Sequence, residues 1–129
     1  MMGDYTPKYF KPAEWQCRCG CGLDRIDMRL LQILDLIRER FGRPIVVTSG
    51  CRCQEHNTAV GGKPGSAHLL GPDNLTHAVD IKCLAPATRF VLVNLLLSFG
   101  IRRLEITNKH IHLDNATHLP QNIIDIAWL

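Results

Sequence analysis

The sequence lacks an apolar run long enough to cross a membrane. Its longest one, FVLVNLLLSFGI (Phe90–Ile101), has 12 residues and is interrupted by Asn94 and Ser98, whereas a membrane-spanning helix needs about 20. The N-terminal stretch MMGDYTPKYFKP also lacks the apolar segment of a signal peptide. We therefore expect no membrane insertion and synthesis in the cytoplasm. The protein would then act outside the cell only if another system exports or releases it.

Dense charge of one sign is missing as well. Lys and Arg number 15 against 12 Asp and Glu, a net charge of +3, and the basic residues are scattered without interleaved aromatic residues. This pattern argues against a nucleic-acid partner, while a mild positive charge is compatible with an acidic polymer such as a cell wall. The chain also lacks repeats and low-complexity linkers. We expect one monomeric domain over residues 1–129, with a Cys-rich segment at 1–22 and a C-terminal extension at 115–129.

Cysteine, in contrast, is abundant. The six cysteines are unevenly spaced, at Cys17, Cys19, Cys21, Cys51, Cys53 and Cys83. All but the last fall in the segments CRCGCG and CRC, whose thiolates offer a second, structural zinc site, although Cys-x-Cys-x-Cys is not the usual zinc-binding spacing. Disulfide bridges and free thiols are the alternatives, and without a signal peptide none of the three is excluded.

Hydrophobic periodicity predicts two helices and about four short strands. The first helix follows Asp27 as its N-cap, places Arg29, Gln32, Asp35 and Glu39 on its polar side, and stops at Gly42 and Pro44. The second helix runs from Pro86 to about Ser98. The strand candidates are PIVVT (44–48), AVDIK (78–82), RRLEI (102–106) and KHIHLD (109–114), the last two joined by a turn at Thr107 and Asn108.

Between the first two strands lies a long, Gly-rich loop with one helical turn near Glu55–Ala59. The apolar end IIDIAWL is expected to pack back on the domain. Because helices and strands do not strictly alternate, the order of elements indicates an α+β fold.

The stretch KHIHLD concentrates ionisable groups. In a strand, His110, His112 and Asp114 share one face, while Ile111 and Leu113 are buried on the other. Three unpaired ionisable groups are costly to bury. The polar face is therefore expected to look into a cleft or into water.

Two further groups complete a possible metal site. His68 ends the Gly-rich loop in SAH, and Asp80 lies on the strand AVDIK. Together with His112 they form a set of three ligands that leaves a fourth position open, as a catalytic zinc requires. Such a zinc lowers the pKa of its water to about 7. The alternative is that these are ordinary surface or hydrogen-bonded histidines.

The segments VVTSGCRC, EHNTAVGG, SAHLLG, AVDI and HIHLD, in this order, resemble the zinc D-Ala-D-Ala carboxypeptidase family of peptidoglycan peptidases. The short phage and bacterial members, lysin-like in type, are closest in pattern, and the resemblance runs from about Phe10 to Asp114. It implies the fold shared with the hedgehog signalling domain, a small antiparallel sheet with helices packed on it.

The resemblance also implies the zinc ligands. The family's Ser-x-His-x-x-Gly element falls on SAHLLG and makes His68 a ligand. Its Ala-x-Asp element falls on AVD and makes Asp80 the second ligand. Its last histidine element falls on HIH and makes His112 the third.

Further roles follow from the same resemblance. His110 is the implied acid/base or transition-state partner, and Arg52 and Ser66 are implied to bind substrate. A planar guanidinium such as that of Arg52 suits a substrate carboxylate or carbonyl. Asp114 is implied to orient a histidine. Glu105 is a weaker candidate base, and we interpret it as a solvated strand residue.

The sequence departs from the family pattern at two places. Six residues, Pro72–His77, lie where the family usually has one. A loop of this length is tolerable, but it introduces Asp73 and His77 as substitute ligands for Asp80. Cys51 also stands where relatives commonly carry an aromatic residue.

The expected function is hydrolysis of an amide bond in peptidoglycan stem peptides by a zinc metallopeptidase, of the carboxypeptidase or endopeptidase type. A non-catalytic zinc-containing binding module of the same fold is the main alternative. A cysteine-rich zinc or disulfide scaffold without chemistry in a cleft is a second one.

Overall fold

The computed structural model describes residues 5–128, so the first four residues of the N-terminal stretch and Leu129 lie outside the description. The elements, in chain order, are α1 (Pro12–Trp15), α2 (Met28–Phe41), β1 (Val47–Ser49), α3 (Gln54–Ala59), β2 (Ala78–Lys82), α4 (Pro86–Ser98), β3 (Arg103–Ile106), β4 (His110–Asp114) and β5 (Ile123–Ile126). The strands form one sheet in the order β1-β2-β4-β3-β5. The expected α+β class is confirmed.

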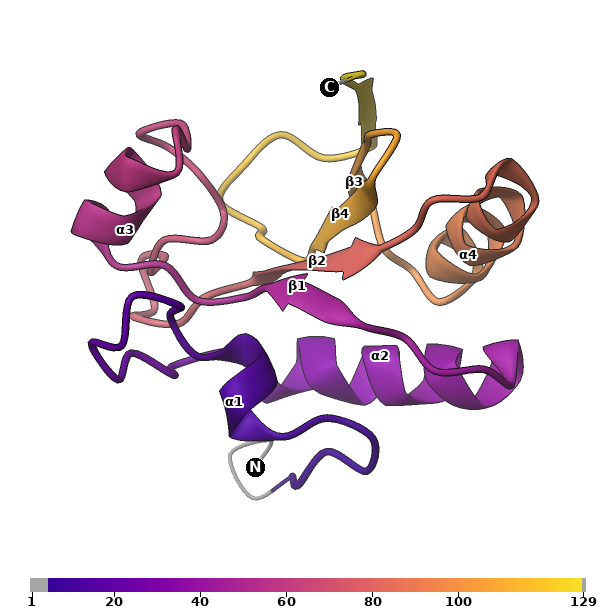
Figure 1. Ribbon diagram of the computed structural model, residues 1–129, viewed down its shortest axis with the longest axis horizontal. Helices are drawn as coiled ribbons and strands as arrows, with labels where there is room; N and C mark the ends of the chain where they lie inside the picture. Colours follow the sequence, from indigo (N-terminus) through magenta and orange to yellow (C-terminus); the bar gives the residue numbers. More distant parts are fainter. Residues whose placement is uncertain (1–4, 129) are drawn as a thin grey trace.

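Alternation along the strands separates the sheet into an apolar and a polar face. On β2 and β4 the side chains of Val79, Ile81, Ile111 and Leu113 are completely buried. They form one core with the apolar sides of α2 and α4, and α2 runs along this side of the sheet (Figure 1). The residues between them on β2 and β4 point to the opposite face, where the polar groups gather.

Helix α2 begins and ends where the sequence predicts. The side chain of Asp27 accepts a hydrogen bond from the backbone N–H of Arg29, and Gly42 ends the helix in the left-handed conformation with φ 76°. Asp35, predicted to lie on the polar side of this helix, is buried instead of solvated. Its carboxylate accepts hydrogen bonds from Tyr5 and from the backbone N–H groups of Lys8 and Tyr9, because the N-terminal segment folds across this side of the helix.

One predicted strand and one predicted turn are shifted along the chain. The first strand is β1, Val47–Ser49, rather than residues 44–48, and Val46, which precedes it, is 52% exposed. The turn between β3 and β4 lies at residues 108–109, one position later than predicted, because Thr107 and His110 close it. The hydroxyl of Thr107 accepts hydrogen bonds from the N–H groups of Lys109 and His110 and thereby fixes this turn.

The C-terminal segment joins the sheet as β5, which pairs in parallel with β3 and makes the sheet mixed rather than purely antiparallel. The segment thus packs back on the domain as expected, but most of its apolar side chains stay outside the core. Ile124, Ile126 and Trp128 are 49%, 69% and 63% exposed. The segment is therefore attached mainly through backbone hydrogen bonds.

The insertion Pro72–His77 runs beside the residues that precede α2. The backbone N–H of Thr76 donates to the carbonyl of Arg25, and the N–H of Asp27 donates to the carbonyl of Thr76. A further bond from the N–H of Gly71 to the carbonyl of Leu75 closes the inserted loop. The extra residues are thus folded against the N-terminal half and return the chain to the start of β2. No helix within residues 5–128 is long and apolar enough to span a membrane.

Candidate metal centre

The register of the sheet aligns four ionisable side chains across its polar face. Asp80 on β2 pairs with His112 on β4, His112 pairs with Glu105 on β3, and Glu105 pairs with Asp125 on β5. Directly paired residues point to the same face. All four line a cleft of about 520 Å³.

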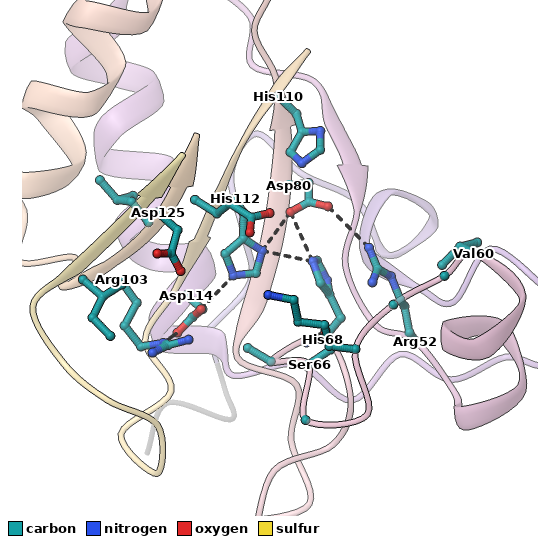
Figure 2. Close-up of a pocket in the computed structure, with 18 residues that line it drawn as sticks. Arg52, Val60, Ser66, His68, Asp80, Arg103, His110, His112, Asp114 and Asp125 are labelled. Atoms are coloured by element: carbon teal, nitrogen blue, oxygen red, sulfur yellow. Dashed lines mark hydrogen bonds and ion pairs between the residues drawn. The ribbon is translucent and has the colours of Figure 1, made fainter. Parts of the chain in front are cut away.

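The structure brings together the three predicted zinc ligands at the centre of this cleft (Figure 2). Nε2 of His68 lies 3.1 Å from Oδ1 of Asp80, and Nδ1 of His112 lies 2.9 Å from the same oxygen. The two ring nitrogens are 3.2 Å apart. Three potential ligand atoms thus form a nearly equilateral triangle.

Contacts behind the rings determine which nitrogens face this triangle. Nδ1 of His68 lies 2.7 Å from the carbonyl oxygen of Gly50, and Nε2 of His112 lies 2.7 Å from Oδ2 of Asp114. Both partners only accept hydrogen bonds, so these nitrogens carry the protons. In the neutral rings, the lone pairs of both histidines are therefore directed at the carboxylate of Asp80.

Three converging lone pairs suit a cation. Ligands about 2.0–2.1 Å from a tetrahedral zinc are separated by about 3.3 Å, close to the observed 2.9–3.2 Å. Two imidazoles and one carboxylate also form the kind of three-ligand set found in catalytic zinc sites. The residues present therefore fit a zinc ion.

The pKa values of the metal-free site also indicate that the three groups attract a cation. Burial alone would raise the pKa of Asp80, but hydrogen bonds from His112 and His68 hold it far below its usual range. Burial would lower the pKa of His112, but hydrogen bonds to Asp114 and Asp80 raise it to about 9. In the absence of a metal, a proton is the cation that the lone pairs share.

Asp114 occupies the supporting position that the sequence implies for it. Its side chain is fully buried, and its Oδ1 accepts a hydrogen bond of 2.7 Å from Nε of Arg103. This salt bridge compensates the buried carboxylate and fixes its other oxygen against His112. Arg103 is a residue that sequence reasoning missed.

Arg52 lies near Oδ2 of Asp80, on the side of this carboxylate opposite His112 (Figure 2). Its Nη2 is 3.5 Å from Oδ2 of Asp80, and its Nε and Nη1 donate to the side chains of Ser49 and Asn57 at 3.2 and 3.3 Å. These contacts hold the guanidinium at the wall of the cleft. Ser66 also lines the cleft, where its hydroxyl accepts from the backbone N–H of His68.

His110 and Glu105 both line the cleft, on neighbouring strands. Figure 2 shows the ring of His110 beside Asp80, on the same face as His112. Glu105 is half-buried next to His112 rather than a freely solvated strand residue. The later position of the β3–β4 turn decides which histidine Glu105 faces, since a turn at Thr107 and Asn108 would have placed Glu105 opposite His110 instead.

The substitute ligands introduced by the insertion lie elsewhere. Nε2 of His77 is 2.7 Å from Oδ2 of Asp73, and its Nδ1 is 3.0 Å from Oδ1 of Asn115 and 3.3 Å from Oδ2 of Asp27. His77 thus belongs to a polar network that ties the insertion to the start of α2. The chain keeps Asp80 at the triangle.

An α+β fold that presents a His, Asp, His set in an open cleft defines a metallohydrolase type of site. The sequence profile described as Peptidase M15 matches residues 8–114. The chain belongs to this family, whose members are zinc-dependent metallopeptidases that act on peptidoglycan. A comparison with curated proteins gave no match.

Proposed function

We propose that the protein is a zinc peptidase that hydrolyses an amide bond in the stem peptides of peptidoglycan, with His68, Asp80 and His112 as the metal ligands. The observation that carries this proposal is the convergence of two imidazole lone pairs and one carboxylate oxygen within 2.9–3.2 Å, at the centre of the cleft. Membership of the Peptidase M15 family supports the substrate class.

A zinc ion at such a site supplies Lewis-acid chemistry, polarising a carbonyl and making water nucleophilic near neutral pH. The protein's own groups position the substrate and move protons. Arg52, held at the wall by Ser49 and Asn57, is placed to donate hydrogen bonds to the oxygen on which negative charge develops. It equally suits a substrate carboxylate.

We assign proton transfer to His110 and treat Glu105 as its competitor, because both line the cleft on the face that carries His112. His110→Asn and Glu105→Gln distinguish them. Loss of the true acid/base lowers kcat by about 10²–10⁴-fold and removes one limb of the pH–rate profile. The other variant keeps both limbs. If Glu105→Gln alone loses a limb, the assignment to His110 is wrong.

The deciding experiment is digestion of purified peptidoglycan by the zinc-loaded protein, with the products identified by mass spectrometry. Release of one terminal residue marks a carboxypeptidase, and conversion of cross-linked peptides to monomers marks an endopeptidase. We expect His112→Ala to abolish cleavage, while His118→Ala, which changes an exposed histidine outside the cleft lining, keeps it.

Two outcomes would contradict the proposal. Cleavage that survives in His112→Ala would place the chemistry elsewhere. A zinc-loaded wild type that binds peptidoglycan without cleaving it would identify a binding module. Because the substrate lies outside the cytoplasmic membrane, the proposal also requires that the protein reach the cell wall.

A further inference from the structure

A second cluster of potential ligands lies outside the cleft. The sulfur atoms of Cys17, Cys19, Cys21 and Cys53 all lie within 4.8 Å of one another. Three of them come from the loop after α1, and the fourth comes from the residue that caps the N-terminus of α3. Residues separated by more than thirty positions in the chain are thus brought to one point.

The spacing of the sulfurs matches a tetrahedral metal site. The Sγ atoms of Cys17, Cys19 and Cys53 are 3.4, 3.7 and 3.9 Å apart. Four thiolates at about 2.3 Å from a zinc ion are about 3.8 Å apart, whereas a disulfide brings two sulfurs to about 2.05 Å. All six cysteines of the chain are unbridged.

Hydrophobic packing does not account for the cluster. Of the four, only Cys17 is buried, whereas Cys19 and Cys21 are exposed and Cys53 is half-buried, so burial of apolar surface does not draw the four side chains together. Cys51 shows the contrast, because it is 1% exposed, packs in the main core and is not one of the four clustered sulfurs. The set of thiols suggested by the sequence is therefore corrected to four, without Cys51.

The backbone around the cluster is shaped to direct the sulfurs inward. Gly20 and Gly22 adopt φ angles of 85° and 86°, which L side chains rarely adopt. The N–H of Cys53 donates to the sulfur of Cys17, and the N–H of His56 donates to the sulfur of Cys53, both at 3.4 Å. Such outer contacts are typical of metal-binding thiolates.

We propose that Cys17, Cys19, Cys21 and Cys53 bind a structural zinc ion, separate from the metal centre of the cleft. Four thiolates in a tetrahedron, without an open position, are the ligand set of structural zinc. The ion cross-links the N-terminal loop to the start of α3. Because Cys53 follows Arg52 directly, the cross-link also anchors the segment that carries Arg52 to the wall of the cleft.

The experiment measures metal content in protein purified under reducing conditions without chelators. We expect about two zinc ions per chain in the wild type, and about one each in Cys19→Ser and in His112→Ala, since each removes a ligand of a different site. Cys83→Ala, which changes a cysteine outside the cluster, should keep two. Cys19→Ser should also lower the melting temperature by roughly 10 °C, because metal binding contributes to folding.

Cobalt substitution identifies the ligands. Wild type and His112→Ala should both show thiolate-to-cobalt charge-transfer absorption, and Cys19→Ser should lose it. A wild type whose only zinc is lost in His112→Ala and kept in Cys19→Ser, a Cys19→Ser variant that keeps the full zinc content, a visible iron spectrum in the purified protein, or disulfides in the intact mass would each overturn the proposal. None of these results touches the metal centre of the cleft, which His112→Ala tests independently.

Discussion

The Nε2 atom of His112 lies 2.7 Å from Oδ2 of Asp114, two positions further along the same strand. Neighbouring residues of a strand alternate between faces, so the two side chains emerge on the same face. The buried carboxylate selects the ring tautomer that leaves Nδ1 directed at Asp80. Two residues of one strand therefore decide which nitrogen is available to a metal.

The first prediction concerns this contact. Asp114→Asn removes the negative charge that stabilises the ring orientation, and we expect zinc affinity at the cleft to fall by about 10–100-fold. Competition with a chromophoric chelator measures this directly. Asp125→Asn is the matched control, because Asp125 is an exposed carboxylate of the same cleft. Unchanged zinc affinity in Asp114→Asn would show that the carboxylate does not orient the ring.

The second prediction is that zinc binding at the cleft releases a proton. In the metal-free protein the pKa of His112 is raised from 6.5 to about 9, so the ring is protonated at pH 7.5 and must lose its proton to bind a metal. Calorimetric titration of zinc in buffers of different ionisation enthalpy should therefore show nearly one proton released by His112 at pH 7.5, in addition to the proton lost by a zinc-bound water. The His112 part should be lost as the pH rises through about 9, and a proton release that does not fall over this range would contradict the raised pKa.

The same raised pKa gives the metal-free protein a pH-dependent stability. Because the folded protein binds the proton of His112 more tightly than the unfolded chain, its contribution is fully present below pH 6.5. It is lost as the pH rises through about 9. Asp80, whose pKa is lowered, contributes in the opposite sense and loses its effect in acid. Thermal unfolding of metal-free His112→Ala should lack the alkaline part of this dependence.

Local sequence signals were sufficient for the parts of the fold that depend on local interactions. Helix α2 has a capping Asp27 and a left-handed Gly42, and both act within one turn of the helix. The alternation in KHIHLD likewise fixes the face on which His112 and Asp114 lie. The turn of the hairpin was misplaced by one position because the hydroxyl of Thr107 closes it, an interaction that composition does not reveal.

Contacts between distant segments were not predictable in this way. The burial of Asp35 depends on a segment that lies more than twenty residues earlier. Arg103 became part of the site because β3 and β4 pair in one register, which places it opposite Asp114. Gly50 orients the ring of His68 through its backbone carbonyl, which no pattern of side chains in the sequence indicates.

A further prediction follows from this glycine. A Cβ at Gly50 would lie 2.6 Å from the carbonyl oxygen and 2.8 Å from the Cα of Trp15, and these backbone atoms cannot move aside without displacing the end of α1. Gly50→Ala should destabilise the protein by about 3 kcal/mol, lowering the melting temperature by roughly 10 °C. The control is Gly65→Ala, whose added methyl group meets nothing within 4 Å. Equal melting temperatures for the two variants would contradict the close approach.

The last prediction separates two roles for Arg52, whose guanidinium lies 3.5 Å from Asp80 and also faces the cleft. If it stabilises charge on the substrate, Arg52→Ala should lower kcat/KM by about 10²–10³-fold at full zinc occupancy. Arg52→Lys should recover only part of this, because an ammonium lacks the planar fork. Arg102→Ala, which changes an exposed arginine outside the cleft lining, should behave as wild type. Loss of zinc in Arg52→Ala would instead show that the guanidinium acts by holding the carboxylate of Asp80 in place for the metal.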